Sequence, residues 1–267
     1  MPGLFATIDW TRPWLAPLLG GAEPLLAAGH YWRDELNRLA AAAELRNHRH
    51  LPLRFVAQTD LPANLAYESF ISQSGCVPTR DNLHDFFNAL IWLSYPRMKR
   101  ELNALQALEI ERATAQGDAQ SVRGHLRDGA TLFDENAALI ISTNASLIDD
   151  LREHRWHEAL LTQKASFGRS VEVALFGHAL MEKLVAPYKA ITAHAWVLVA
   201  PASYFEMSLA QQRTWLDQAA AQCITAGLST NDFTPLPVLG VPGWWPAQDA
   251  AFYADVTVFR ARRTRKL

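Results

Sequence analysis

Residues 77–113, VPTRDNLHDFFNALIWLSYPRMKRELNALQALEIERA, contain two consecutive helical patterns and favour a helix-rich fold. In the first pattern the apolar residues recur at helical spacing: Leu83, Phe86, Phe87, Leu90 and Ile91. Pro96 ends this helix because proline has no amide hydrogen to donate to the preceding turn. A second long helix is expected from about 97 to 115. The chain of 267 residues is long enough to bury a real core around such helices.

Strand patterns are short and irregularly spaced. Five segments are predicted as strands: 53–56, 139–143, 171–177, 195–200 and 252–260. Strands that alternate with helices can form a parallel α/β sheet, but the irregular spacing and the helical first half favour an α+β fold. We therefore expect a single domain over 1–267, rich in helices, with a small mixed sheet of about five short strands. An irregular proline-rich segment is expected at 1–30.

Composition excludes several classes of protein. Hydrophobic residues make up 49% of the chain, which excludes a disordered or collagen-like protein, and the net charge of −2 argues against nucleic-acid binding by the bulk of the chain. The basic tail at 260–267, RARRTRKL, is the one segment suited to phosphates or anionic lipids. We expect no membrane span, because no uncharged run reaches the roughly 18 residues that one needs.

The two cysteines also limit the possibilities. Cys76 and Cys223 are far apart and form no CxxC pattern, which excludes a disulfide framework and a cysteine zinc finger. Two free thiols suit a reducing compartment. The N-terminal residues MPGLFATIDW lack the pattern of a secretory signal. A cytoplasmic location is therefore predicted.

Polar residues interrupt the first helical pattern at 78–90. Asp81, Asp85 and Asn88 are spaced i, i+4 and i+7, and His84 precedes Asn88 by four residues, so these side chains lie along one side of a helix. The adjacent His84 and Asp85 resemble part of a metal phosphohydrolase signature and are predicted metal ligands, with His84 also a candidate base. Asn88 is predicted to bind substrate.

Two further polar residues, Arg80 and Asn82, stand at the expected start of this helix. Free N–H groups and the helix dipole favour anions at that position. Both residues are predicted to bind an anionic substrate group. The alternative is local capping, in which Thr79 or Asp81 caps the helix and Asn82 bonds to the backbone.

Residues 123–136 are predicted to be a loop. The second polar stretch, RDGATLFDENAAL at 127–139, falls mostly within it and contains three acids, Asp128, Asp134 and Glu135. Acids at this density bind divalent cations or share a proton. Asp134 is the predicted general base and Arg127 a predicted substrate ligand. The alternative is that Asp134 caps a helix or turn.

Two histidines complete the candidate site. His178 and Glu182 are spaced i, i+4 on a predicted helix, which lets both bind one metal or lets Glu182 orient the imidazole. His194 lies in an uncharged run, where it is either an acid–base residue or a buried histidine bonded to the backbone.

The apolar loop VLGVPGWWP, 238–246, presents Trp244 and Trp245. Trp244 is predicted to line a substrate pocket, while packing over the core is the alternative.

Familiar signatures such as GxGxxG, GxxxxGK[ST], HExxH and GxSxG are missing. The function hypothesis is a metal-assisted hydrolase or lyase that acts on an anionic small molecule. A divalent metal is the expected cofactor. Its predicted ligands are His84, Asp85, His178 and Glu182. The predicted general base is Asp134 or His194, and Arg80 is predicted to bind the anionic group of the substrate.

Two other hypotheses remain open. One is a metal-free acid–base enzyme that uses His84 or His194 with a carboxylate partner. The other is a non-enzymatic binding protein that presents the Trp244/Trp245 loop and the basic tail to a protein, a membrane or RNA. In that case deletion of 260–267 flattens the salt dependence of association.

Several phrases resemble one bacterial family, domain of unknown function 3025. They occur in the same order from about 50 to 260: LPLRFV, NLHDFFNAL, RDGATLFDEN, FGHALMEKL, TAHAW and PLPVLGVPGWW. The most specific is NLHDFFNAL. The resemblance implies a single domain but no activity, cofactor or partner.

Overall fold

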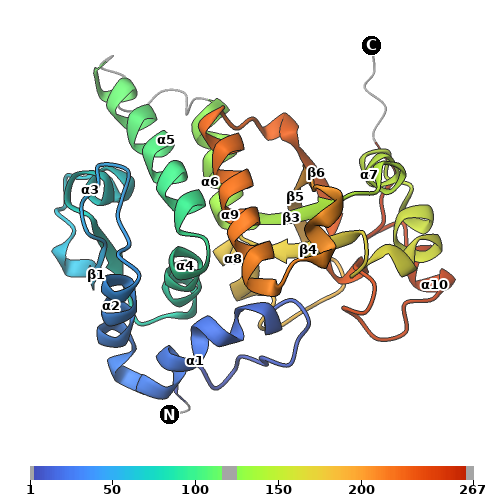
Figure 1. The fold of residues 1–267 in the computed structure, drawn as a ribbon, viewed down its shortest axis with the longest axis horizontal. Helices are drawn as coiled ribbons and strands as arrows, with labels where there is room; N and C mark the ends of the chain where they lie inside the picture. Colours follow the sequence, from blue (N-terminus) through green and yellow to red (C-terminus); the bar gives the residue numbers. More distant parts are fainter. Residues whose placement is uncertain (1–2, 116–124, 263–267) are drawn as a thin grey trace.

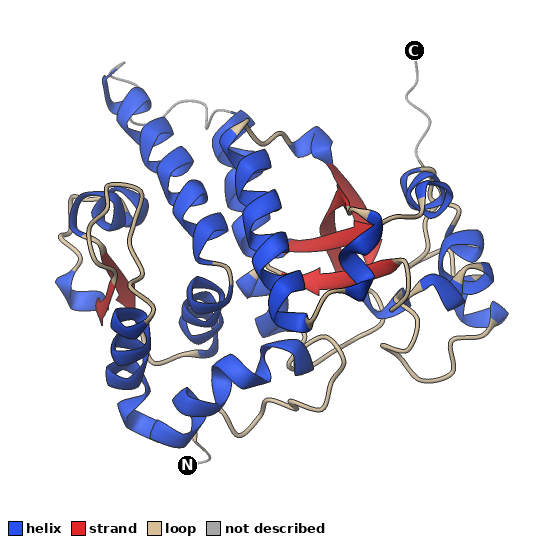
Figure 2. Cartoon of the chain, viewed as in Figure 1, coloured by secondary structure: helices blue, strands red, loops and turns tan. Residues whose placement is uncertain are grey.

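The computed structural model describes residues 3–115 and 125–262, with the side chains of 125–127 outside that part. Ten α-helices and two sheets occupy the described residues (Figures 1 and 2). The helices are α1 (Leu19–Ala28), α2 (Trp32–Ala42), α3 (Tyr67–Ser74), α4 (Leu83–Ser94), α5 (Pro96–Ala115), α6 (His125–Asn136), α7 (Ala145–Arg152), α8 (His178–Lys183), α9 (Leu209–Thr225) and α10 (Ala250–Tyr253). The predicted helix-rich α+β class is confirmed.

The larger sheet has four strands in the order β4-β3-β5-β6. Their bounds are β3 (Ala137–Ser142), β4 (Val171–Leu175), β5 (Thr192–Val199) and β6 (Phe233–Pro237). β3 pairs in parallel with β5 and antiparallel with β4, and β6 pairs antiparallel with β5. All six residues of the central strand β3 are buried, as expected for a strand covered on both faces. The sheet is mixed, as predicted.

A second, two-stranded parallel sheet lies in the helical half of the molecule (Figure 2). It joins β1 (Arg54–Ala57) to β2 (Cys76–Thr79). The crossover between them contains α3, and β2 leads directly into α4. This small sheet therefore fixes where α3 and the start of α4 lie.

Five helices, α3, α4, α5, α6 and α8, pack on one another. α5 packs against α3 and α6, while α8 packs against α4 and α6. In Figure 1, α6 and α9 lie between α5 and the four-stranded sheet. The two long helices predicted from 77–113 are α4 and α5, and Pro96 stands at the first position of α5. Residues far apart in the sequence thus meet where these helices converge.

The structure differs from three local predictions. The predicted loop at 123–136 contains α6, because Ala130 and Phe133 bury themselves at helical spacing. The predicted strand at 252–260 instead begins with the end of α10 and continues as turns, with Asp249 capping the helix. The N-terminal segment is irregular only in its first half, since α1 forms around buried Ala22 and Leu25 despite Pro24.

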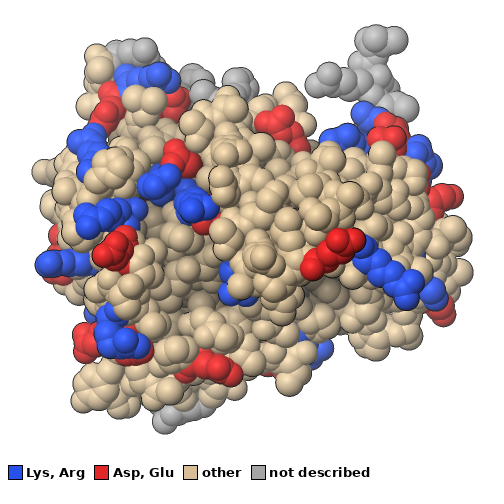
Figure 3. Space-filling view, viewed as in Figure 1, with Lys and Arg blue, Asp and Glu red and all other residues tan. Residues whose placement is uncertain are grey.

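Charged side chains on the surface are mixed in sign. On the face drawn in Figure 3, basic and acidic side chains lie interspersed around a largely uncharged centre. Among the described helices, none combines the length and the apolar character that crossing a bilayer requires.

Gly177 is the N-cap of α8, which follows β4 in the chain, and it lies against the end of α6. Its amide donates to the carbonyl of Ala137 at 2.9 Å. A Cβ atom at Gly177 would lie 2.4 Å from the Ala137 nitrogen and 2.6 Å from the Asn136 Cα, which no real side chain tolerates. Glycine therefore allows α8 to begin against the last turn of α6, and this contact places His178 beside Asp134 and Glu135.

We predict that Gly177→Ala lowers the free energy of unfolding by about 1–3 kcal/mol, because the two segments must separate. Gly20→Ala is the matched control, since nothing lies within 4 Å of a Cβ there and alanine favours the helix. Urea unfolding measures both variants. Equal unfolding midpoints for the two variants would contradict the close approach.

Candidate functional site

A cavity of about 280 Å³ lies where α3, α4, α5, α6 and α8 converge. Titratable side chains dominate its lining: Glu68, Arg80, His84, Asp85, Asp134, Glu135 and His178. Two of the four predicted metal ligands, His84 and His178, lie close together in this cavity. Five of the seven titratable residues come from the two polar stretches identified in the sequence. Arg80, His84 and Asp85 belong to 78–90, and Asp134 and Glu135 belong to 127–139.

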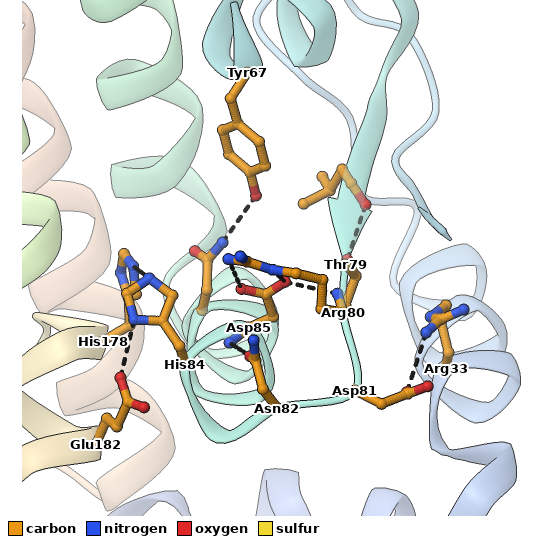
Figure 4. Close-up of polar contacts among 12 residues, drawn as sticks. Arg33, Tyr67, Thr79, Arg80, Asp81, Asn82, His84, Asp85, His178 and Glu182 are labelled. Atoms are coloured by element: carbon orange, nitrogen blue, oxygen red, sulfur yellow. Dashed lines mark hydrogen bonds and ion pairs between the residues drawn. The ribbon is translucent and has the colours of Figure 1, made fainter. Parts of the chain in front are cut away.

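His84 and His178 face each other at the cavity wall. Their Nε2 atoms are 3.0 Å apart, although the residues are 94 positions apart in the sequence. The Nδ1 atom of His84 is 3.0 Å from Glu182 Oε2, and Figure 4 shows the His84 ring between His178 and Glu182. A Glu182 carboxylate that accepts the Nδ1–H of His84 leaves a lone pair on His84 Nε2, which accepts from His178 Nε2 in this structure. Glu182 thus orients His84, not its helical neighbour His178.

His178 is the more buried of the two histidines, with 4% of the residue exposed. Burial lowers its pKa to about 4, and Asp134 opposes that effect only in part. The ring is therefore neutral near pH 7, which is the form that binds metals. Its Nδ1 atom lies 4.0 Å from Asp134 Oδ1 and has no hydrogen-bond partner among the described residues.

Glu135 supplies a third donor atom beside the two histidines. Its Oε2 lies 3.6 Å from His178 Nε2, and donor atoms of His84, Glu135 and His178 all lie within 4.8 Å of one another. Burial, followed by the charge of Asp134, raises the pKa of the Glu135 carboxyl. The three donors are close enough for one metal ion to contact all of them.

Asp134 is held by a buried ion pair with Lys99 of α5. Lys99 Nζ donates to Asp134 Oδ1 at 2.6 Å, and the two residues are 4% and 7% exposed. Burial is the largest single effect and acts to raise the pKa of Asp134, but the charge and hydrogen bond of Lys99 together with the nearby histidines outweigh it and leave the pKa below its ordinary value. The predicted general base is therefore a paired carboxylate that joins α5 to α6.

Asp85 is held by Arg80 at the entrance to α4. Its carboxylate accepts from the Arg80 backbone amide at 2.6 Å and from Nε and Nη2 at 3.0 Å each (Figure 4). The predicted metal ligand Asp85 and the predicted anion binder Arg80 therefore form a bidentate pair. Arg80 Nη1 has no hydrogen-bond acceptor in the described part of the chain.

The two asparagines of this stretch have different surroundings. Asn82 caps α4, with its Oδ1 accepting the Asp85 amide at 2.8 Å, as the capping alternative expects. Asn88 lines the cavity and donates to the Tyr67 hydroxyl at 3.0 Å. Its Oδ1 is buried and has no donor among the described residues.

Glu68 is a cavity residue that sequence reasoning missed. It lies on α3 and accepts from Asn103 Nδ2 of α5 at 2.7 Å. Burial raises the pKa of its carboxyl to about 7, with Lys99 opposing and the acidic Asp134 adding to the shift. A carboxyl that titrates near neutrality is suited to proton transfer.

Of three other predicted residues, two do not line this cavity and the side chain of the third lies outside the described part. Arg127 is in the first turn of α6, where its side chain is not described. His194 is on β5, where burial lowers its pKa. Trp244 is half-buried and its ring centroid lies 5.9 Å from that of Trp14, so it packs against the N-terminal segment. Of the basic tail, residues 263–267 lie outside the described residues.

The sequence contains a signal for one of the residues that sequence reasoning missed, Glu135, but not for Glu68 or Lys99. Glu135 stands beside Asp134 in a stretch already identified as acidic, and the helical phase of α6 could have indicated it. Glu68 and Lys99 sit in ordinary amphipathic helices, and neither has a local motif. Only the packing of α3 and α6 on α5 brings them to the site.

Comparison with known proteins finds one family. The family model described as "Protein of unknown function (DUF3025)" matches residues 53–263. No curated protein and no solved structure matches the chain.

The raised pKa of Glu68 predicts a pH-dependent stability. Between the ordinary value of 4.5 and about 7, the folded chain binds more protons at this group than the unfolded chain does. Its contribution to stability therefore falls as the pH rises through that window, by at most about 3 kcal/mol. Glu68→Gln should remove this decline.

Urea unfolding of the metal-free chain at pH 5 and pH 8 measures the effect. The exposed Glu23, changed to Gln, is the control and should keep the wild-type decline. Parallel profiles for Glu68→Gln and the wild type would show that Glu68 does not titrate near neutrality.

Proposed function

The chain belongs to the DUF3025 family of proteins of unknown function, and we propose that it is a metal-assisted hydrolase or lyase that acts on an anionic small molecule. The observation that supports this proposal is the convergence of His84, Glu135 and His178 in one cavity. Two imidazoles and one carboxylate are a donor set used by catalytic zinc and by non-haem iron.

The distances between these donors suit a single ion. With ligand bonds of about 2.1 Å, the 3.0 Å separation of the two Nε2 atoms corresponds to an angle of about 90–95° at the ion. The 3.6 Å separation of His178 Nε2 from Glu135 Oε2 corresponds to about 120°. The first angle is near the 90° of octahedral coordination and the second is nearer the roughly 109° of tetrahedral coordination, so one of these separations would change when an ion binds.

The charge of the cavity also favours a cation. Four carboxyl groups line it: Glu68, Asp85, Asp134 and Glu135. Two cations, Arg80 and Lys99, pair with Asp85 and Asp134. Four acids against two cations leave Glu68 and Glu135 without a cationic partner among the described residues. A divalent ion would balance these two carboxyl groups.

The donor set leaves coordination positions for water or substrate. A bound metal would polarise a substrate oxygen or lower the pKa of a bound water. Glu68 would then transfer the proton, since its carboxyl changes charge near pH 7 and lines the same cavity. Arg80, fixed by Asp85, would offer Nη1 to an anionic group, and Asn88, which lines the same cavity, would contact the substrate.

The metal-free alternative rests on the same histidines. His84, oriented by Glu182, could act as an acid–base residue without a metal, with Glu68 as a second carboxyl in the cavity. The two proposals differ in one measurable property, namely whether the chain binds a transition metal at these side chains.

Metal content and affinity test the proposal. Elemental analysis of protein purified without chelator should find close to one transition metal per chain, and calorimetry with Zn²⁺, Mn²⁺ and Fe²⁺ should reload the stripped protein. We expect His84→Ala, His178→Ala and Glu135→Ala each to weaken the best-bound metal at least 100-fold, because each removes a ligand. Glu182→Gln should weaken it about 10–100-fold, because it removes the partner that orients His84.

The matched control is His157→Ala, which removes an exposed histidine outside the cavity and should leave metal affinity unchanged. Unfolding midpoints of the variants confirm that each is folded. Binding of none of the three metals, or equal affinity in the wild type and in His178→Ala, would overturn the metal proposal and favour the metal-free enzyme.

A further inference from the structure

A second cavity, of about 420 Å³, lies under the N-terminal segment. Residues 13–18 form one wall, and β4 and α9 form the others. Its size falls in the range of roughly 300–1,000 Å³ that holds small organic ligands. The family model begins at residue 53, so this cavity depends on a part of the chain outside the matched range. Among the described residues, it shares no lining residue with the cavity that contains His84, Glu135 and His178.

The walls of this cavity are mainly apolar and aromatic. Trp14, Tyr95, Leu175, Tyr204 and Leu216 contribute large side chains, all nearly inaccessible to solvent. Such walls bind the apolar body of a ligand through area removed from water. They do not by themselves select a ligand.

Glu172 of β4 is the acidic group of the cavity. Its Oε2 accepts from the Tyr204 hydroxyl at 2.9 Å, which occupies one of about four lone-pair positions on the carboxylate. Within the described residues, no Lys, Arg or His nitrogen lies within 4.0 Å of this carboxylate. Burial raises the pKa of Glu172, while Tyr204 and Arg213 oppose that effect. A half-buried carboxylate without a cationic partner is suited to binding a cation.

Arg213 of α9 is the basic group of the cavity, and its charge acts on Glu172. Its Nη2 donates to the carbonyl of Pro17, which holds the N-terminal segment over the cavity, and it pairs with no described carboxylate. A fixed positive charge on this wall disfavours a ligand with a second cation. The complementary ligand therefore has one positive charge and an apolar body.

We propose that this cavity is a second binding site, which takes a small apolar ammonium compound with its nitrogen on Glu172 and its hydrocarbon part against Trp14, Tyr95 and Leu216. This site is separate from the cavity that contains His84, Glu135 and His178, and the proposal does not depend on the proposed enzymatic function.

Calorimetry or ligand-observed NMR on the full chain tests this site with three phenyl-bearing probes of similar size. The probes are 2-phenylethylamine, 2-phenylethanol and 3-phenylpropionate, which present an ammonium, a hydroxyl and a carboxylate. We expect the ammonium probe to bind at least tenfold more tightly than the other two. Equal affinities, or no binding of the ammonium probe up to about 10 mM, would overturn the proposal.

Variants then locate the binding. Glu172→Gln should weaken the ammonium probe at least tenfold, because it removes the charge and keeps the shape. Glu206→Gln is the control, since Glu206 is exposed and lies outside the cavity. Unchanged affinity in a folded Glu172→Gln variant would overturn the assignment. The probe series on the wild type tests the proposal even if that variant does not fold.

Discussion

The buried ion pair between Lys99 and Asp134 is the interaction on which the rest of the site depends. Two charges removed from water are stable only when each pairs closely with the other, and removal of one partner leaves a costly unpaired charge. The pair fixes α6 against α5 and so holds Glu135, the next residue, at the cavity. At the end of α6, Gly177 allows α8 to begin in contact with Asn136, which brings His178 to the same cavity. The ion pair and this close approach together determine where the donor atoms meet.

The remaining acids give the cavity its chemical character. Asp85 and Asp134 are neutralised by cations of the protein, whereas Glu68 and Glu135 are not. Burial raises the pKa of both unpaired carboxyls, so the folded chain holds them in an environment that disfavours their charged form. A bound cation would relieve this unfavourable environment. The same arrangement that lowers the stability of the metal-free chain is therefore the one that would favour metal binding.

The sequence predicted the helices that form the site better than it predicted which residues of different helices are in contact. Helical spacing correctly indicated α4 and α8, and it identified both His84 and His178. It paired Glu182 with His178 because they are neighbours on one helix, but Glu182 lies against His84, since α8 packs on α4. Local patterns contain no information on such contacts between helices. For the same reason Glu68, which has no motif around it, could not be found from the sequence.

Whether a metal binds at these donors is decided most directly by anomalous diffraction at the zinc edge, from crystals of the full chain loaded with Zn²⁺. The structure predicts one strong peak at about 2.0–2.2 Å from His84 Nε2, His178 Nε2 and a Glu135 carboxylate oxygen, with Glu182 still bonded to His84 Nδ1. A loaded crystal with no peak in this cavity, or with zinc bound only elsewhere, would contradict the metal site.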